Sequence, residues 1–263
     1  MSNTGRHGAT LRAAAVALMF ALLLCGCATR KTNLQSATFR VMTYNIHHGE
    51  GTDGRIDLLR LAEVINQEGA DIVALQEVDK GVERTKRRDL PAELAALTGM
   101  TCVFSNNFYF QGGEYGNAVL TRFPVLRAGE QRGLLQLLVD VNGRHLLFMN
   151  THIDYRPDPE ERLLNVEEIK RVAGHYGRLP VILCGDFNDT PGSLVHQKLK
   201  EQFMDSWEAV GQGDGFTYSS DRLIKRIDYV FLSAGSPLVP LKSWVPQSDA
   251  SDHLPLVVEL RMK

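Results

Sequence analysis

The stretch VILCGDFNDTP at residues 181–191 decides the fold, because it reads as a buried strand that ends in polar side chains. Its apolar run, 181–184, is short and lies between a proline and a glycine, which favours a strand buried on both faces over a helix. Asp186 and Asn188 follow two residues apart, so in an extended backbone their side chains leave on one face. A strand end of this kind is typical of an active site, since the sheet positions groups at its open edge. The tetrapeptide GDFN also fits a turn closed by an Asx hydrogen bond.

The composition indicates one large core without a basic surface. The chain has 263 residues, of which 44% are hydrophobic, and this is enough for a single domain of sheets and helices. The net charge is -2, and loss of an N-terminal leader containing Arg6 and Arg12 would make the chain more acidic still. This charge excludes the basic footprint of a tight polyanion binder.

The N-terminal residues read as a targeting signal. Two arginines precede an apolar run at residues 13–24, which is too short to span a bilayer. The run ends in LCGC at 24–27, which resembles a bacterial lipobox and implies cleavage before Cys27 and lipid attachment to it. We therefore expect a lipoprotein signal peptide at 1–26, a lipidated tether at 27–37 and a folded domain at 38–263, anchored to the membrane on its periplasmic or extracellular side. An ordinary cleaved signal peptide and a permanent transmembrane helix are the alternatives.

The two cysteines of the folded domain, Cys102 and Cys184, lie in apolar runs. We expect two buried thiols, although an oxidising compartment would permit a disulfide between them. A zinc site is not indicated, because the chain has no CxxC spacing.

Strand and helix patterns follow one another along the rest of the chain. Helices are expected after Asp57, near residues 91–97, after Asp158 and shortly after Pro191. The charged segment 78–88 reads either as a solvated loop or as a phosphate-attracting one. The signals between residues 101 and 150 suggest an antiparallel meander, with a hairpin turn at Asn142-Gly143. Strands are expected at 38–45, 72–75, 101–105, 117–121, 134–141, 146–150, 181–184, 227–232 and 256–260.

Polar residues end or follow these apolar strands in many separate places. One such residue alone is usually a cap, a turn former or a satisfied histidine. If all of these residues line one cleft, a single explanation accounts for their positions. Separate structural roles would need a different explanation for each residue. Carboxylate and amide oxygens without cysteine select Mg2+ or a similar hard ion. The set comprises Asn45, Glu77, His152, Asp186, Asn188, Asp228, Asp252 and His253.

Seven motifs occur in an order similar to that of the endonuclease/exonuclease/phosphatase superfamily, whose members have a deoxyribonuclease I-like fold. The resemblance extends over residues 38–260 and implies an α/β, four-layered sandwich. Two central, mostly antiparallel β-sheets would pack face to face with helices on the outside, and the cleft would lie at one edge of the sheets. The motifs are MTYNI at 42–46, ALQEV at 74–78, GNAVLTRFPV at 116–125, NTHID at 150–154, GDFND at 185–189, RIDYVF at 226–231 and SDHLPL at 251–256.

The resemblance also implies roles for the polar set. Glu77 resembles the principal metal ligand, with Asn45 and Asp252 nearby, and the metal would be Mg2+, with Mn2+ or Ca2+ as alternatives. His152 resembles a donor to the phosphate. Asp186, oriented by Asn188, resembles the group that activates the attacking water, and Asp228 resembles the partner that orients and charges His253. The sequence leaves open whether Asp186 or His253 is the general base.

The resemblance implies a metal-dependent phosphoester hydrolase, a phosphodiesterase or a phosphatase, which we expect to be a monomer. The motifs TYNIHHG at 43–49, DGRIDL at 53–58 and QEVD at 76–79 resemble bacterial proteins related to GPI-anchor lipid remodelling factors. A phospholipid head group or a small phosphodiester is therefore the expected substrate. The alternatives are a non-specific endonuclease or exonuclease outside the cytoplasm, and a catalytically inactive binding lipoprotein.

Overall fold

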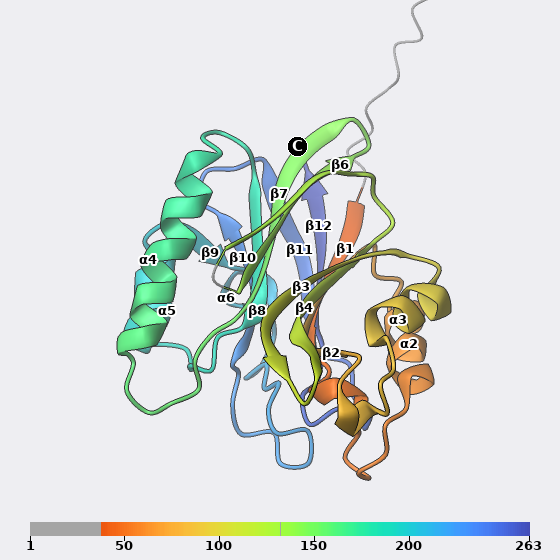
Figure 1. The fold of residues 1–263 in the computed structure, drawn as a ribbon. Coiled ribbons are helices and arrows are strands. Elements are labelled where there is room, and N and C mark those ends of the chain that lie inside the picture. Colours follow the sequence, from red (N-terminus) through yellow and green to blue (C-terminus); the bar gives the residue numbers. More distant parts are fainter. Residues whose placement is uncertain (1–37, 132) are drawn as a thin grey trace, which may run out of the picture. The chain divides into compact units, whose positions relative to one another are not determined.

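The computed structural model describes residues 38–131 and 133–263, which contain two six-stranded β-sheets (Figure 1). The predicted signal peptide at 1–26 and tether at 27–37 lie outside the described residues. Within the described part of the chain, no helix is both long enough and apolar enough to cross a membrane.

The first sheet has the order β11-β12-β1-β2-β4-β3, and the second has the order β5-β6-β7-β8-β10-β9. Each contains one parallel pair, β1 with β2 and β7 with β8, and its other pairs are antiparallel. The predicted sandwich of mostly antiparallel sheets is therefore confirmed. The strands are β1 (Thr38–Asn45), β2 (Ile72–Lys80), β3 (Thr101–Phe110), β4 (Gly113–Thr121), β5 (Val125–Gln131), β6 (Leu134–Val141), β7 (Arg144–His152), β8 (Val181–Asp186), β9 (Phe203–Asp205), β10 (Asp228–Ser233), β11 (Leu238–Trp244) and β12 (Leu256–Met262).

Helices cover the outer face of each sheet, so that the domain has four layers (Figure 1). Helices α2 (Leu58–Gln67) and α3 (Leu90–Thr98) pack on the first sheet, and α4 (Glu160–His175) and α5 (Leu194–Lys200) pack on the second. A separate apolar cluster fills the space between the sheets. Each fully buried leucine or valine in these layers stabilises the fold by about 1.5–3 kcal/mol relative to exposure. The remaining short elements are α6 (Ser206–Val210) and the 3-10 helices His47–Gly49 and Glu83–Thr85.

The two parallel strand pairs bring the candidate functional residues to one edge of each sheet. Helix α2 connects β1 to β2 and helix α4 connects β7 to β8, so each pair forms a β-α-β unit. Because parallel strands end at the same edge of a sheet, the residues that follow β1 and β2 lie together, as do those that follow β7 and β8. Strand β10 runs the opposite way and begins at this edge, where Asp228 pairs with Asp186.

Local chemistry explains where the helices begin. The Asp57 side chain accepts a hydrogen bond from Leu59 N, and the Asp89 side chain accepts one from Ala92 N, as N-cap residues do. Helix α4 begins one residue later than expected. Pro159 lies just outside the helix, and Asp158 accepts the hydrogen bond of Glu160 N.

The predicted meander over residues 101–150 is wrong. Strands β3 and β4 form a hairpin in the first sheet, and the chain then crosses to the second sheet, where β5, β6 and β7 pair. The crossing lies at Phe123-Pro124, where proline cannot donate a ladder hydrogen bond and Phe123 packs edge-on against Phe39. The Asn142-Gly143 turn between β6 and β7 is confirmed, with φ of 54° and 84°.

Both cysteines of the described residues are free thiols, as expected. Cys184 is buried in β8, and Cys102 is half-buried in β3.

Candidate active site

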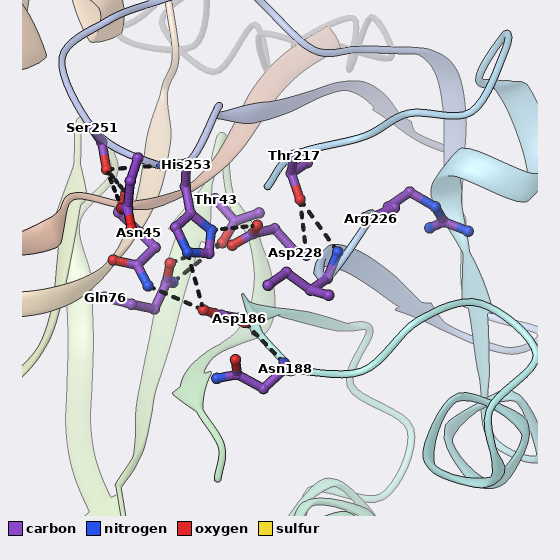
Figure 2. Close-up of polar contacts among 12 residues, drawn as sticks. Thr43, Asn45, Gln76, Asp186, Asn188, Thr217, Arg226, Asp228, Ser251 and His253 are labelled. Carbon is purple, nitrogen blue, oxygen red and sulfur yellow. Dashed lines mark hydrogen bonds and ion pairs between the residues drawn. The ribbon is translucent and has the colours of Figure 1, made fainter. Parts of the chain in front are cut away.

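Asn45 joins the two sheets at the edge where β1 and β8 end (Figure 2). Its Nδ2 donates hydrogen bonds to Glu77 Oε1 and to Asp186 Oδ2, each at 3.0 Å. Its Oδ1 accepts a hydrogen bond from His47 N at 3.1 Å. A single buried amide thus holds two carboxylates from separate sheets side by side.

A β-bulge places Glu77. The pairing of β2 with β4 shifts register between Leu75 and Val78, and Glu77 has a φ of 59°, which is uncommon for a residue other than glycine. The prediction that this strand ends at Leu75 is therefore wrong, because β2 resumes after the bulge and continues to Lys80. The bulge breaks the alternation of the strand and turns the Glu77 side chain to the edge of the sheet.

Asp186 is almost fully buried and is fixed at both of its oxygens. Oδ2 accepts the hydrogen bond of Asn45, and Oδ1 accepts one from Asn188 N at 2.9 Å. The second contact is an Asx turn, so the turn interpretation of GDFN is confirmed, and Asp186 also lines the cleft described below. Asn188 does not remain extended as expected, because its φ is 46°.

The Asn188 amide faces His152 rather than Asp186. Its Nδ2 donates to the Ile153 carbonyl oxygen at 3.1 Å and lies 3.1 Å from His152 Nε2. Because a carbonyl oxygen can only accept, the amide nitrogen is the atom that faces both groups. A neutral His152 therefore accepts at Nε2 and carries its proton on Nδ1.

His253 lies between two aspartates (Figure 2). Its Nδ1 is 2.9 Å from Asp228 Oδ2, the contact expected from the sequence, and its Nε2 is 3.7 Å from Asp186 Oδ2. Burial of the ring opposes protonation, but the charge and hydrogen bond of Asp228, with the charges of Asp186 and Asp252, raise the pKa of His253 to about 10. At neutral pH the ring is an imidazolium.

A cleft of about 660 Å3 brings the predicted residues together. Six of the eight line it, while Asn45 and Asp228 lie buried directly behind their partners. His152 Nε2 is 3.6 Å from Asp186 Oδ2, and Asp252 Oδ1 is 3.8 Å from His47 Nδ1. The lining residues are Glu77, Tyr115, His152, Tyr155, Asp186, Asn188, Asp189, Thr190, Tyr218, Lys225, Ile227, Asp252 and His253.

Sequence reasoning missed Asn150, the buried residue that supports the bulge. Its Nδ2 donates to the carbonyl oxygens of Leu75 and Ala118, and its Oδ1 accepts from Gln76 Nε2 at 2.7 Å. It extends from the second sheet to the first and satisfies a carbonyl of the strand that the bulge interrupts. A polar residue directly after the apolar run of β7, still within the strand, was the signal that could have indicated this role.

Ser251 and Thr217 were missed as well. Ser251 Oγ donates to the Asn45 carbonyl oxygen at 2.8 Å and accepts from His253 N at 3.2 Å. Thr217 Oγ1 accepts from Asp228 N at 3.3 Å. These hydroxyls fix the backbone on both sides of the Asp228 to His253 contact (Figure 2).

The arginines of the charged segment 78–88 have partners within the fold. Arg84 forms two hydrogen bonds with the buried Asp79, Arg87 donates to the carbonyl oxygens of Gly81 and Gly112, and Arg88 pairs with Glu93. Because these three arginines are occupied by contacts within the fold, the structure does not favour the interpretation of this segment as a phosphate-attracting loop.

The donor set fits a divalent cation. Burial opposes ionisation of Glu77, but the neighbouring His152 and the hydrogen bond from Asn45 outweigh it, so that the pKa of Glu77 lies below its usual value. Glu77 Oε2 has no hydrogen bond within residues 38–131 and 133–263, and the half-exposed carboxylate of Asp252 lines the same cleft. Asp186, Asp228 and His253 also have ligand atoms within 4.8 Å of one another. The carboxylates among these groups are the hard oxygen ligands that Mg2+ prefers.

A second acidic cluster, His196, Asp205 and Glu208, lies outside the cleft. Asp205 Oδ2 is 2.7 Å from Arg226 Nη1 and 3.0 Å from His196 Nε2, and Gly192 N donates to His196 Nδ1. Because the arginine already neutralises Asp205, this cluster is an internal ion-pair network.

Several known proteins are similar to this chain in sequence or in fold. The uncharacterised protein YbhP of Escherichia coli K12 is 26% identical over 256 residues, which cover 87% of this chain and 98% of YbhP. The structure of an endonuclease/exonuclease/phosphatase from Beutenbergia cavernae is 26% identical with a TM-score of 0.70, and the alignment covers 86% of this chain and 72% of that one. The mannosyl-6-phosphatase Bt3783 of Bacteroides thetaiotaomicron shares the fold, with 18% identity, a TM-score of 0.69 and coverage of 84% and 99%. A family profile matches residues 42–253, from the strand that carries Asn45 to His253 itself, and the chain therefore belongs to the Endonuclease/Exonuclease/phosphatase family.

Proposed function

We propose that this protein is a metal-dependent phosphoester hydrolase. The observation that carries the proposal is the contact of Asn45 with both Glu77 and Asp186, beside the imidazoles of His152 and His253. Members of the family act on phosphoesters, and this cleft holds the carboxylates and imidazoles that such a reaction requires. We propose Glu77 and Asp252 as the residues that hold the cation, with Asn45 beside them. A bound Mg2+ would neutralise the phosphate oxygens and polarise the phosphorus centre.

We infer that Asp186 is the general base. It must accept a proton from the attacking water, and both of its oxygens are fixed, with Oδ2 facing the two histidines. A protonated His253 cannot take that proton, because its pKa is raised to about 10. The choice between Asp186 and His253 therefore favours the aspartate.

The two histidines then serve as donors to the phosphate. The imidazolium of His253 brings a positive charge to the cleft and can donate from Nε2. Because Asn188 donates to His152 Nε2, a neutral His152 offers Nδ1–H instead. Both donors act where charge accumulates as the phosphoester is attacked.

We propose a small phosphoester, such as a small phosphodiester or a phospholipid head group, as the substrate. The net charge of the chain is -2, and Lys225 is the one lysine or arginine that lines the cleft among the described residues, which disfavours a long polyanion such as DNA or RNA. The resemblance to the GPI-anchor lipid remodelling branch and the lipobox-like residues 24–27 support an enzyme tethered by lipid outside the cytoplasm.

The test is hydrolysis by the purified mature protein, with and without a chelator, of a panel of DNA, RNA, sphingomyelin, inositol phosphates, phospholipids and bis-p-nitrophenyl phosphate. We expect turnover of small phosphoesters that a chelator abolishes and Mg2+ restores. Turnover confined to DNA or RNA would support the nuclease alternative. Binding without turnover of any substrate would support an inactive binding protein and contradict the proposal.

A further inference from the structure

Lys225 is an exposed cation that lines the cleft and has no partner for its charge among the described residues. It is the one lysine or arginine among the cleft-lining residues that the structure describes, and its ammonium makes no hydrogen bond or ion pair with residues 38–131 or 133–263. Three other arginines near the cleft are paired: Arg162 with Asp189, Arg84 with Asp79, and Arg156 with Asp154. The cation is therefore available to a ligand in the cleft.

The backbone holds Lys225 in place on both sides. Lys225 N donates to the Tyr218 carbonyl oxygen at 2.8 Å, and Tyr218 N donates to the Lys225 carbonyl oxygen at 3.0 Å. The next residue, Arg226, is buried and anchored to Asp205 at 2.7 Å, and Figure 2 shows its side chain pointing away from Asp228 and His253. The backbone of Lys225 is therefore fixed. Ligand binding by its side chain costs less conformational entropy than binding by a residue on a mobile loop would.

Tyr218 connects this lysine to the reaction centre. Its ring centroid lies 4.8 Å from that of His253, and its backbone pairs with both His253 and Lys225. The neighbouring Leu254 N donates to the Thr217 carbonyl oxygen at 2.7 Å, which fixes the loop against the segment that carries His253. Lys225 is therefore next to the residue that packs on the catalytic imidazole.

The cleft lining combines several carboxylates with a single lysine or arginine among the described residues, Lys225. Glu77, Asp186 and Asp252 lie with the imidazoles at the proposed reaction centre, and Asp189 is neutralised by Arg162. Lys225 lines the cleft together with Tyr218 and forms no ion pair with a carboxylate among the described residues. A substrate that carries one phosphate would satisfy the reaction centre and leave this cation unused.

We propose that Lys225 and Tyr218 form a subsite for a second anionic group, a phosphate or a carboxylate, on the substrate. This inference rests on the proposed hydrolase function and narrows it to phosphoesters that carry a further anion next to the bond that is cleaved. The second anion would pair with the ammonium and accept a hydrogen bond from the Tyr218 hydroxyl. Lys225 is then a specificity-determining residue.

The experiment compares substrates that differ by one anionic group. Glucose 1,6-bisphosphate is compared with glucose 6-phosphate to test a second anion on a soluble substrate. Vesicles that contain phosphatidylinositol 4-phosphate are compared with vesicles that contain phosphatidylinositol to test a second anion on a lipid head group. The measured quantity is the ratio of kcat/KM within each pair, for the wild type, Lys225→Met, Lys225→Arg and Arg222→Met. Arg222 is a matched control because it is an exposed cation on the same loop that does not line the cleft.

We expect the wild type to prefer the substrate with the second anion in at least one pair. Lys225→Met should lower that ratio about tenfold, Lys225→Arg should retain most of it, and Arg222→Met should leave it unchanged. The preference should weaken in 0.5 M salt, since a partly exposed ion pair is screened. A ratio that Lys225→Met leaves unchanged, or a wild type without preference, would overturn the subsite while leaving the hydrolase proposal intact. Absence of metal-dependent turnover of every substrate would overturn both.

Discussion

At the scale of single residues, the contact of Asp228 with His253 governs the charge of the cleft. Both side chains are buried, and Asp186 and Asp252 add negative potential around the ring. Because the pKa of His253 is raised, its favourable interaction with Asp228 contributes fully to stability below about pH 6.5. This contribution is lost as the pH rises through about 10.

Asp228→Asn should remove the charge that keeps this ring protonated. The pKa of His253 should fall by at least 2 units, since burial of the ring then meets less opposition. NMR titration of the imidazole in metal-free protein measures this change. Asp214→Asn, a carboxylate outside the cleft, is the control and should leave the titration unchanged. A His253 pKa that stays near 10 in the first variant would show that Asp228 does not charge the ring.

The same pair should act as one unit in catalysis. Asp228→Asn should lower activity by orders of magnitude, more steeply at high pH, where the ring loses its proton. His253→Ala should be similarly severe. The double variant should be little worse than either single one, because residues that act together lose their function once. Multiplicative losses in this cycle would mean that the two act independently.

Glu77→Gln should weaken metal binding at least tenfold, as it keeps the shape of the side chain and removes its charge. The measurement is calorimetric titration of Mg2+ or Mn2+ into the variant. Glu63→Gln, an exposed glutamate on α2, is the matched control. Unchanged affinity in Glu77→Gln would move the ligand role to Asp252 or Asp186.

At the scale of elements, the bulge of β2 and the Asn150 side chain from β7 act together. Asn150→Asp keeps the acceptor for Gln76 but removes both donors to Leu75 and Ala118. Each unsatisfied buried group costs about 1–3 kcal/mol, so we expect the free energy of unfolding to fall by about 3 kcal/mol. Urea unfolding measures the loss, and Asn165→Asp, at a half-buried position on α4, should change it by less than about 0.5 kcal/mol.

Metal affinity is the second readout of Asn150→Asp. If Asn150 holds the bulge, then the variant should also bind Mg2+ more weakly, although Asn150 does not line the cleft. A stability loss with wild-type metal affinity would show that the bulge keeps its geometry without Asn150.

The central strands could be predicted from the sequence, and three of the four edge strands could not. The bounds of β1 and β6 are those expected, because their apolar side chains are buried by sheet neighbours on both sides. The three strands that were missed, β5, β9 and β11, all lie at a sheet edge. An edge strand has one hydrogen-bonded neighbour, and the side chains of β5 are almost all exposed, so its sequence carries little apolar periodicity.

In the candidate site, the polar residues at the ends of strands could be predicted from the sequence, whereas residues defined by contacts between distant segments could not. Residues that end buried strands, such as Asp186 and Asn45, stand out because a polar group there is costly unless it is used. Asn150 and Lys225 could not be assigned, since their roles depend on residues distant in the sequence. The orientation of Asn188 was also beyond prediction, because its left-handed backbone follows from the Asx turn.

At the scale of the whole molecule, the site forms where the carboxyl ends of β1 and β8 meet from opposite sheets. Neither sheet alone holds the complete set, since Asn45 and Glu77 come from one and His152 and Asp186 from the other. We therefore expect activity to disappear together with the packing between the sheets.

We predict that Cys27 carries lipid in the mature protein, because a small residue and a short apolar run precede it. Mass spectrometry of the mature N-terminus measures the modification directly. Cys27→Ser should release the protein from the membrane fraction, whereas Cys102→Ser, in the folded domain, should not. An unmodified N-terminus that begins elsewhere would contradict the prediction.

The most direct test of a phosphoester hydrolase built around Asp186 is the rate of p-nitrophenol release from bis-p-nitrophenyl phosphate in Mg2+ buffer. We predict that the wild type and Asp214→Asn hydrolyse the substrate at the same rate, and that a chelator stops both. Asp186→Asn should be slower by about 100-fold or more, as loss of a general base implies. A wild-type rate in Asp186→Asn, or a rate in the wild type that is indifferent to the chelator, would contradict the account.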